Sequence, residues 1–270
     1  MFKMIVVDLD GTILNNEKKL SKDTKKYLKM LKKKGYIIVI ATGRIYRSAL
    51  KITHGAKFAN YIITDTGTCI YSVSHKKAIM KQTIPQTTIQ KFFAYYDEKC
   101  RYIDICSKNK IYKYSKEKEN NSIVKTTMEK KYILKKCPNA SHISIAMKTN
   151  EDVIALYNKM LKEIPELDIL VMQDSFSQRK WLETMPKGVS KYSSIKILAD
   201  SLKIANEEII AFGDGLNDIE MLEKCGYGVA LLNSLEEVKR RADDITKFDY
   251  NHDGVIKYLK EHLYDNKKIR

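Results

Sequence analysis

Most of the predicted architecture follows from one segment, Met4-Ile5-Val6-Val7-Asp8-Leu9-Asp10-Gly11-Thr12. Its first four residues are an apolar run of the kind that forms a buried parallel strand. Asp8 and Asp10 follow at the predicted carboxyl end of this strand, where an open α/β sheet presents its ligand crevice. Two carboxylates at that position can divide nucleophilic attack and proton transfer between them. A tight turn at Asp10-Gly11 is the alternative interpretation, and it requires no partners elsewhere in the chain.

Strands and helices alternate on both sides of a distinct middle region. This alternation predicts a Rossmann-like, doubly wound parallel sheet with helices on both faces. Ser21 and Gly35 supply the N-cap and the stop of the first helix. The predicted helices are 22–34, about 45–54, about 190–203, about 217–224, about 235–241 and about 253–263, and the further strands are 36–41, 61–63, 208–212 and 227–230.

The middle of the chain has a different pattern. Alternating strands at 102–106 and 143–147 mix with helices at about 87–99 and 151–163, and the polar, lysine-rich stretch 107–131 is interpreted as a loop. We therefore predict an α+β domain at 86–184, inserted into an α/β core formed by 1–85 and 185–270.

Composition narrows the class of protein. The chain has 270 residues, is 44% hydrophobic and carries a net charge of +16. Its lysines lie in short groups along the whole chain, which favours solvated helix faces over a specific nucleic-acid site, although anionic partners stay open. Five scattered cysteines without a CxxC pair indicate reduced thiols. With no apolar run long enough for a membrane span and no signal peptide, we expect a cytoplasmic protein.

Two further polar clusters follow predicted strands. Thr42-Gly43-Arg44 comes after the strand at 36–41, and a hydroxyl with a glycine amide at a helix start can hold a phosphate, although an N-cap threonine explains it equally well. Gly213-Asp214-Gly215-Leu216-Asn217-Asp218 comes after the strand at 208–212. Its carboxylates and amide are hard oxygen ligands that suit magnesium, and an Asx-rich turn is the alternative.

Lys191 is weak evidence by itself, because a solvated lysine is the default interpretation in so basic a chain. The clusters are more specific in combination. They place carboxylates for a cation, and hydroxyl, amide and ammonium groups for a phosphate, at the ends of three predicted parallel strands.

With these residues in view, the whole chain resembles the haloacid dehalogenase superfamily, in its Cof-type branch with a type IIB cap. Asn251-His252-Asp253-Gly254-Val255 also resembles the C-terminal signature of that branch. The segments that resemble the four motifs of the superfamily are Asp8 to Thr12, Thr42 to Arg44, Lys191 within 186–191, and Gly213 to Asp218.

The resemblance implies a phosphatase that uses a phospho-aspartate. Asp8 would attack phosphorus, and Asp10 would protonate the leaving oxygen and then activate water, which requires the pKa of Asp10 to lie above that of Asp8. Mg²⁺ would be held by Asp8, the Asp10 main-chain carbonyl and Asp214, with Asp218 in support. The residues implied to bind or offset the phosphoryl group are Leu9, Thr42, Gly43, Lys191 and Asn217. The inserted domain would be a cap that selects the substrate.

The sequence departs from the branch at three places. Thr66 stands where Asn is common, Tyr192 where Gly is usual, and 231–234 read Leu-Leu-Asn-Ser. These departures leave the substrate open among sugar phosphates, nucleotides and phosphorylated cofactors such as pyridoxal phosphate or flavin mononucleotide. A phosphomutase of the same superfamily and a basic nucleic-acid-binding protein are the alternative functions. We expect a monomer or weak dimer with a small phosphorylated metabolite as its partner.

Overall fold

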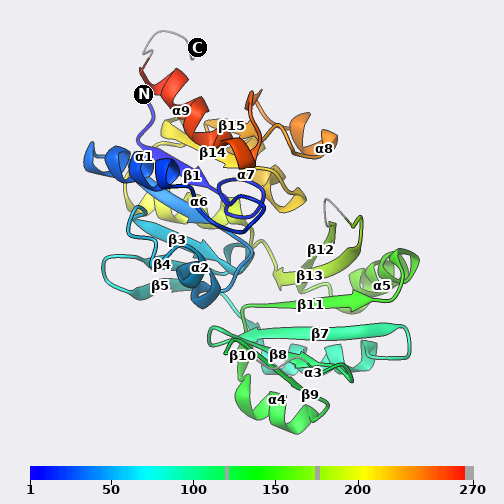
Figure 1. Cartoon of the computed structure of the whole chain (residues 1–270). Coiled ribbons are helices and arrows are strands. Elements are labelled where there is room, and N and C mark those ends of the chain that lie inside the picture. Colours follow the sequence, from blue (N-terminus) through cyan, green and yellow to red (C-terminus); the bar gives the residue numbers. More distant parts are fainter. Residues whose placement is uncertain (119–121, 174–176, 265–270) are drawn as a thin grey trace. The chain divides into compact units, whose positions relative to one another are not determined.

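The computed structural model describes residues 1–118, 122–173 and 177–264 (Figure 1). The chain divides into two compact units. The core unit comprises Met1–Arg44, Ala49–Ile79 and Ser190–Arg270, and the inserted unit comprises Ile45–Ser48 and Met80–Val189. The inserted unit therefore extends about five residues beyond the predicted range 86–184 at each end, and it also includes a short segment that follows Arg44.

The core unit is built on one sheet with the order β16-β15-β14-β1-β2-β3-β4-β5. Neighbours from β16 to β3 pair in parallel, whereas β4 pairs antiparallel to β3. The chain runs outward from β1 to β3 and later returns to the other side of β1 at β14, which makes the boundary between β1 and β14 the topological switch point. The strands are β1 (Met4–Val7), β2 (Ile37–Ala41), β3 (Tyr61–Thr64), β4 (Cys69–Ser72), β5 (Lys77–Lys81), β14 (Ile209–Gly213), β15 (Tyr227–Ala230) and β16 (Asp244–Ile245).

Helices cover both faces of this sheet, which confirms the predicted fold class. α1 packs with α9 and α6 packs with α7. Because crossovers between parallel strands are right-handed as a rule, the two pairs are expected on opposite faces of the sheet. Ser21 caps α1 by accepting a hydrogen bond from the Thr24 amide at 2.9 Å, as predicted. The helices and 3₁₀ turns are α1 (Lys22–Lys33), α2 (Tyr46–Ile52), η1 (Asp65–Gly67), α6 (Lys191–Ser201), η3 (Asn206–Glu208), η4 (Leu216–Asp218), α7 (Ile219–Lys224), α8 (Glu236–Lys239), η5 (Tyr250–His252) and α9 (Gly254–Tyr264).

The inserted unit is an α+β structure with a sheet of order β12-β13-β11-β7-β8-β9 and a small ladder of β6 with β10. The interpretation of 107–131 as a loop is wrong, because it contains two strands, which pair with each other in parallel. Both strands are short and carry lysine or threonine beside their apolar residues, which hid the strand pattern. The elements are β6 (Ile84–Pro85), α3 (Gln86–Phe92), η2 (Phe93–Tyr95), β7 (Cys100–Ser107), β8 (Lys110–Tyr114), β9 (Val124–Thr127), α4 (Lys130–Lys136), β10 (Asn139–Ala140), β11 (His142–Met147), α5 (Asn150–Glu163), β12 (Leu167–Gln173) and β13 (Lys180–Pro186).

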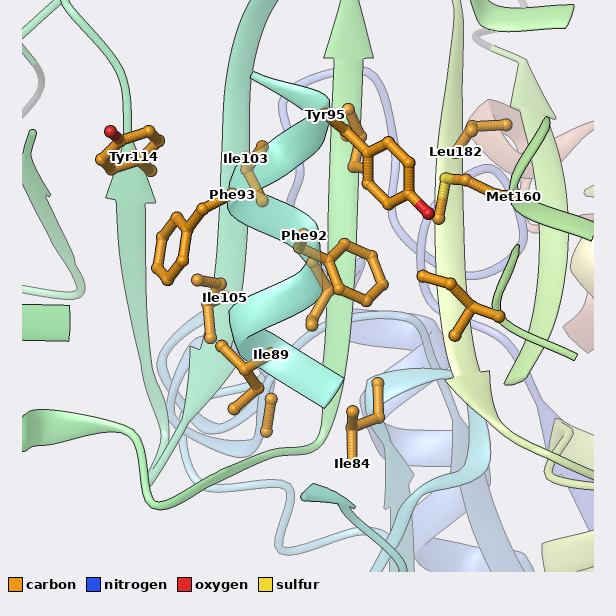
Figure 2. Packing of buried hydrophobic residues seen from close by; sticks show 14 of the residues in the cluster. Ile84, Ile89, Phe92, Phe93, Tyr95, Ile103, Ile105, Tyr114, Met160 and Leu182 are labelled. Atoms are coloured by element: carbon orange, nitrogen blue, oxygen red, sulfur yellow. The ribbon is translucent and has the colours of Figure 1, made fainter. Parts of the chain in front are cut away.

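The inserted unit has a hydrophobic core of its own. Phe92 of α3 is fully buried and lies among isoleucines of β7 and side chains of α5 and β13 (Figure 2). Its ring meets Tyr95 edge-on with centroids 6.0 Å apart, and Phe93 meets Tyr114 at 5.0 Å. Ile103 and Ile105 of β7, Ile143 and Ile145 of β11 and Leu182 of β13 enter this core, so the residues next to them in each strand face the other side of the sheet.

Candidate active site

Asp8 and Asp214 lie at the switch point of the core sheet. They follow β1 and β14, which are parallel neighbours, and the Asp8 amide donates to the Phe212 carbonyl at 3.0 Å. Gly11 has a φ of +78°, and a Cβ there would lie 2.1 Å from Asp214 Oδ2. The glycine is therefore needed both for the turn and for the close approach of the two loops.

Lys191 lies between the carboxylates. Its Nζ donates to Asp8 Oδ1 at 2.8 Å and to Asp218 Oδ1 at 2.6 Å, and its side chain is 1% exposed. The default interpretation of a solvated lysine is therefore wrong. Lys191 is the first residue of α6, whose N-cap Ser190 forms a capping box with Ser193.

A tight contact holds the start of α6 against the η1 turn. A Cβ on Gly67 would lie 2.1 Å from the Ser190 carbonyl oxygen, and Gly67 has a φ of +108°. The Gly67 carbonyl also accepts a hydrogen bond from the Ser194 hydroxyl. The loop after β3 thus fixes the position from which Lys191 reaches the site.

Asp218 orders the loop that carries Asp214. Its Oδ2 accepts hydrogen bonds from the amides of Asp214 at 3.0 Å and Gly215 at 2.9 Å, while its Oδ1 binds Lys191. Thr12 donates from its hydroxyl to Asp214 Oδ1 at 2.7 Å. The loop therefore has the contacts of an Asx-rich turn and also places the partly buried Asp214 carboxylate in the site.

The site holds more negative than positive charge. Burial raises the pKa of Asp8 to about 7, with Lys191 opposing the shift and Asp218 adding to it. Burial also raises the pKa of Asp214, and the charge of Asp8 raises it further. The neighbouring carboxylates raise the pKa of Lys191 despite its burial, so it stays charged.

Asp10 has a different environment, although it lies only two residues from Asp8. Arg44 donates from Nε to Asp10 Oδ2 at 2.5 Å and from Nη2 to Asp10 Oδ1 at 2.7 Å, and Lys18 Nζ lies 3.1 Å from Oδ1. Burial acts to raise the pKa of Asp10, but Arg44 and Lys18 outweigh it and lower the pKa. The expected order, with the pKa of Asp10 above that of Asp8, is therefore wrong for the protein without ligands.

Of the residues predicted to bind phosphate, Thr42, Gly43 and Asn217 come together. A Cβ on Gly43 would lie 3.4 Å from Thr66 Oγ1 and 3.7 Å from Asn217 Nδ2, so loops from three strands meet there. Thr42 Oγ1 accepts from the Arg44 amide at 3.2 Å, which gives it a capping role inside the same loop. The Leu9 side chain is buried, so the predicted contact of this residue falls to its main chain.

Comparisons with known proteins agree with this geometry. The model of the haloacid dehalogenase-like hydrolases matches residues 5–259. The chain belongs to the haloacid dehalogenase-like hydrolases. This confirms the predicted family and the prediction of a hydrolase.

Individual relatives of this hydrolase cover nearly its whole length. A protein from Buchnera aphidicola subsp. Baizongia pistaciae is 31% identical over 271 residues, which are 96% of this chain and 97% of its own, and its name gives no substrate. The 5-amino-6-(5-phospho-D-ribitylamino)uracil phosphatase of Bacillus subtilis is 25% identical over 261 residues, 96% of this chain and 94% of its own. A solved haloacid dehalogenase-like hydrolase from B. subtilis shares the fold, with a TM-score of 0.84, 23% identity and coverage of 97% of this chain and all of the other.

The donor set of this haloacid dehalogenase-like hydrolase fits a magnesium ion. Asp8, Asp214 and Asp218 each offer a carboxylate oxygen, all within 4.8 Å of one another. The cluster consists of hard oxygen donors, which magnesium prefers, and contains neither cysteine nor histidine. Two buried carboxylates and the partly buried Asp214, against one ammonium, also leave negative charge that a divalent cation would neutralise.

Sequence reasoning missed three contacts of this site. It did not assign Thr12 to Asp214, Arg44 to Asp10, or Asn233, whose Nδ2 donates to the Gly11 carbonyl at 2.9 Å. Thr12 and Arg44 lie inside the quoted motifs, so the sequence indicated that they belong to the site but not which residues they contact. Asn233 lies more than two hundred residues from Gly11, and only the pairing of β14 with its neighbours brings the two together.

The inserted unit carries a polar row on the sheet face opposite its hydrophobic core. Ser144 is in register with Asp104 on one side and with Glu183 on the other, and Asp104 is in register with Lys113. Lys113 Nζ lies 3.9 Å from Asp104 Oδ2, and His142 Nε2 lies 3.6 Å from Glu183 Oε1. Carboxylates and a hydroxyl in one row can accept hydrogen bonds from hydroxyl or amino groups.

Among the described residues, no helix has the length and apolar character that crossing a membrane requires.

Proposed function

We propose that this protein is a magnesium-dependent phosphatase that hydrolyses phosphomonoesters of small metabolites through a phospho-aspartate on Asp8. The observation that carries the proposal is the buried Lys191, whose Nζ joins Asp8 to Asp218 beside Asp214. With a divalent cation to neutralise the excess negative charge, a buried ammonium among carboxylates at a sheet switch point would be suited to receive a dianionic phosphate.

In the first step, a carboxylate oxygen of Asp8 forms a bond to phosphorus while the bond from phosphorus to the leaving oxygen breaks. Asp10 gives its proton to that leaving oxygen. Lys191 offsets the repulsion between Asp8 and the phosphate, and Thr42 with Asn217 would bind phosphoryl oxygens. When bound at Asp8, the Asp10 carbonyl and Asp214, Mg²⁺ supplies charge neutralisation for the phosphoryl group.

In the second step, water attacks phosphorus and the bond between phosphorus and Asp8 breaks. Asp10, now ionised, takes the proton from the attacking water. Inorganic phosphate leaves, and both aspartates return to their starting protonation states. The step balances without an oxidant, a reductant or a second substrate.

The inserted unit would select the leaving group. The polar row of Asp104, Ser144 and Glu183 favours leaving groups with hydroxyl or amino groups, as in sugar phosphates, nucleotides and phosphorylated cofactors. The B. subtilis relative, named for a phosphate on a ribityl chain, supports a hydroxylated leaving group. The five free, buried cysteines support a cytoplasmic location.

The test is a panel of phosphorylated metabolites assayed with magnesium, together with acid-quenched labelling of the protein. Wild type should release phosphate and carry acid-stable label, whereas Asp8→Asn should carry none. Label at the wild-type level on Asp8→Asn would place the nucleophile elsewhere. Transfer of the label to a second hydroxyl compound, in place of release as phosphate, would favour the phosphomutase alternative.

A further inference from the structure

We propose that Arg44 is a positioning residue for Asp10, an inference that rests on the proposed function. Arg44 meets the Asp10 carboxylate at both oxygens, with Nε at 2.5 Å and Nη2 at 2.7 Å. A two-point contact between a planar guanidinium and a carboxylate fixes the plane of the carboxylate as well as its position. Oδ2, which Lys18 does not contact, keeps a second lone pair that is available for proton exchange with a substrate.

Arg44 is better suited to this task than the other basic neighbour of Asp10. Lys18 contacts only Oδ1, at 3.1 Å, and its side chain is 55% exposed, compared with 27% for Arg44. A single ammonium contact from a solvated side chain restrains distance but not orientation. Lys18 therefore adds charge, whereas Arg44 determines the direction in which Asp10 points.

The backbone of Arg44 is itself anchored in the loops that meet at Gly43. Its amide donates to Thr42 Oγ1 at 3.2 Å, and its carbonyl accepts from the Asp65 amide at 3.0 Å. One residue thus connects the proposed phosphate loop to the proposed acid and base. Through Arg44, the position of the phosphate site and the direction of the Asp10 carboxyl are set together.

A direct role in phosphate binding is the competing explanation for Arg44. The two explanations predict different dependence on the leaving group. A phosphate ligand acts on every phosphomonoester alike, because all share the phosphoryl group. A residue that acts through Asp10 affects only substrates whose leaving oxygen needs a proton.

The experiment is rapid-quench measurement of the first step, phosphoenzyme formation, with an alkyl phosphate and with a nitrophenyl phosphate. Arg44→Gln should slow this step by about tenfold or more with the alkyl phosphate, as part of the 10²–10⁴-fold that proton transfer typically contributes. With the nitrophenyl phosphate the change should be within about threefold, because nitrophenolate leaves without a proton. Arg44→Lys should give an intermediate loss with the alkyl phosphate, because lysine keeps the charge and loses the two-point contact.

Two controls separate positioning from a general disturbance. Arg241→Gln removes an arginine from a surface pair with Glu223 at 2.6 Å and should leave both substrates unaffected. In an Asp10→Asn background, Arg44→Gln should cause no further loss with the alkyl phosphate, because the residue it positions is already inactive. Equal losses on both substrates, or a full additional loss in the double variant, would overturn the inference. If wild type formed a phosphoenzyme with neither substrate, the proposed function itself would fail, and the inference with it.

Discussion

Replacing the proposed nucleophile should make the metal-free protein more stable. Burial raises the pKa of Asp8 from 3.8 to about 7, against the opposing charge of Lys191 and with the help of Asp218. Ionised Asp8 is therefore unfavourable in the folded protein without a cation. Asp8→Asn keeps the shape of the carboxyl, can still accept a hydrogen bond from Lys191, and carries no charge.

The size of the effect follows from the two pKa values. Between pH 3.8 and about 7, the folded protein holds a proton on Asp8 that the unfolded chain has released, so stability falls as the pH rises. A difference of one in pKa corresponds to about 1.4 kcal/mol, and the whole interval to about 4 kcal/mol. At about pH 8 the free energy of unfolding of Asp8→Asn should therefore exceed that of wild type by up to about 4 kcal/mol, and at about pH 4 the two should agree.

Calorimetry in the presence of a chelator is the suitable assay. The single tryptophan, Trp181, lies in the inserted unit, so its fluorescence does not follow the core. For a unit of this size about 1 kcal/mol moves the melting temperature by about 2–4 °C, so an upward shift of up to about 8–16 °C is expected. Asp200→Asn, at an exposed aspartate that pairs with Lys196, is the matched control and should shift nothing comparable.

Magnesium gives an internal check on the same reasoning. Adding magnesium should reduce the difference in melting temperature between Asp8→Asn and wild type, because the ion binds and stabilises the folded wild type more than the variant. A variant no more stable than wild type at about pH 8 in chelator, or a difference independent of pH, would refute the argument from the buried charge of Asp8.

Four other perturbations test the remaining parts of the proposal. Chelation should abolish phosphatase activity and magnesium should restore it, since the site offers only hard oxygen donors, and full activity in chelator would contradict the metal assignment. Asp10→Asn should slow phosphoenzyme formation from an alkyl phosphate by about 10²–10⁴-fold. With a nitrophenyl phosphate the same variant should give a burst of nitrophenol as phosphoenzyme accumulates. Equal loss of rate with both substrates, and no burst, would show that Asp10 does not transfer protons. Thr66→Asn should raise the free energy of unfolding by about 1 kcal/mol in chemical denaturation, because the β-branched Thr66 has a φ of 54° and asparagine tolerates this left-handed backbone better. A destabilised variant would show that contacts of the Thr66 hydroxyl outweigh the backbone strain. Ser144→Ala should change the ranking of substrates on a metabolite panel and leave inhibition by inorganic phosphate unchanged, and an unaltered ranking would argue against leaving-group selection by the polar row.

The fold was predictable wherever the pattern was local. β1 and β14, which end just before Asp8 and Asp214, are continuous apolar runs. Ser21 and Gly35 mark the two ends of α1, as expected. β8 and β9 were missed because they are short and place lysines and threonines among few apolar residues, so that polar composition outweighed the period of two. β8 pairs with β7 and β9 pairs with β8, and the local sequence specifies neither partner.

The burial of Lys191 was not predictable in the same way. The chain has 49 basic residues, and nothing adjacent to Lys191 distinguishes it from the others. Its burial results from the contact of Gly67 with Ser190 and from carboxylates on two other loops, 27 and 183 residues away in sequence. The motif resemblance supplied what local pattern could not, because it carries information about contacts between distant segments.

The protonation states of Asp8 and Asp10 depend on their surroundings in the fold, which the sequence does not reveal. Their spacing predicts that both serve one site, but it does not determine which of them holds a proton. Asp8 is buried beside Lys191, whereas Asp10 is a third exposed and paired with Arg44, so the ligand-free protein favours an ionised Asp10. A dianionic phosphate beside Asp10 repels its charge and raises its pKa, which is the direction that proton donation requires. Arg44 can keep the carboxyl oriented through this change, because a guanidinium needs only one lone pair on each oxygen. Under the proposed mechanism, the required order of the two pKa values would therefore arise only with substrate bound, and the paired contact with Arg44 would hold Asp10 in place until then.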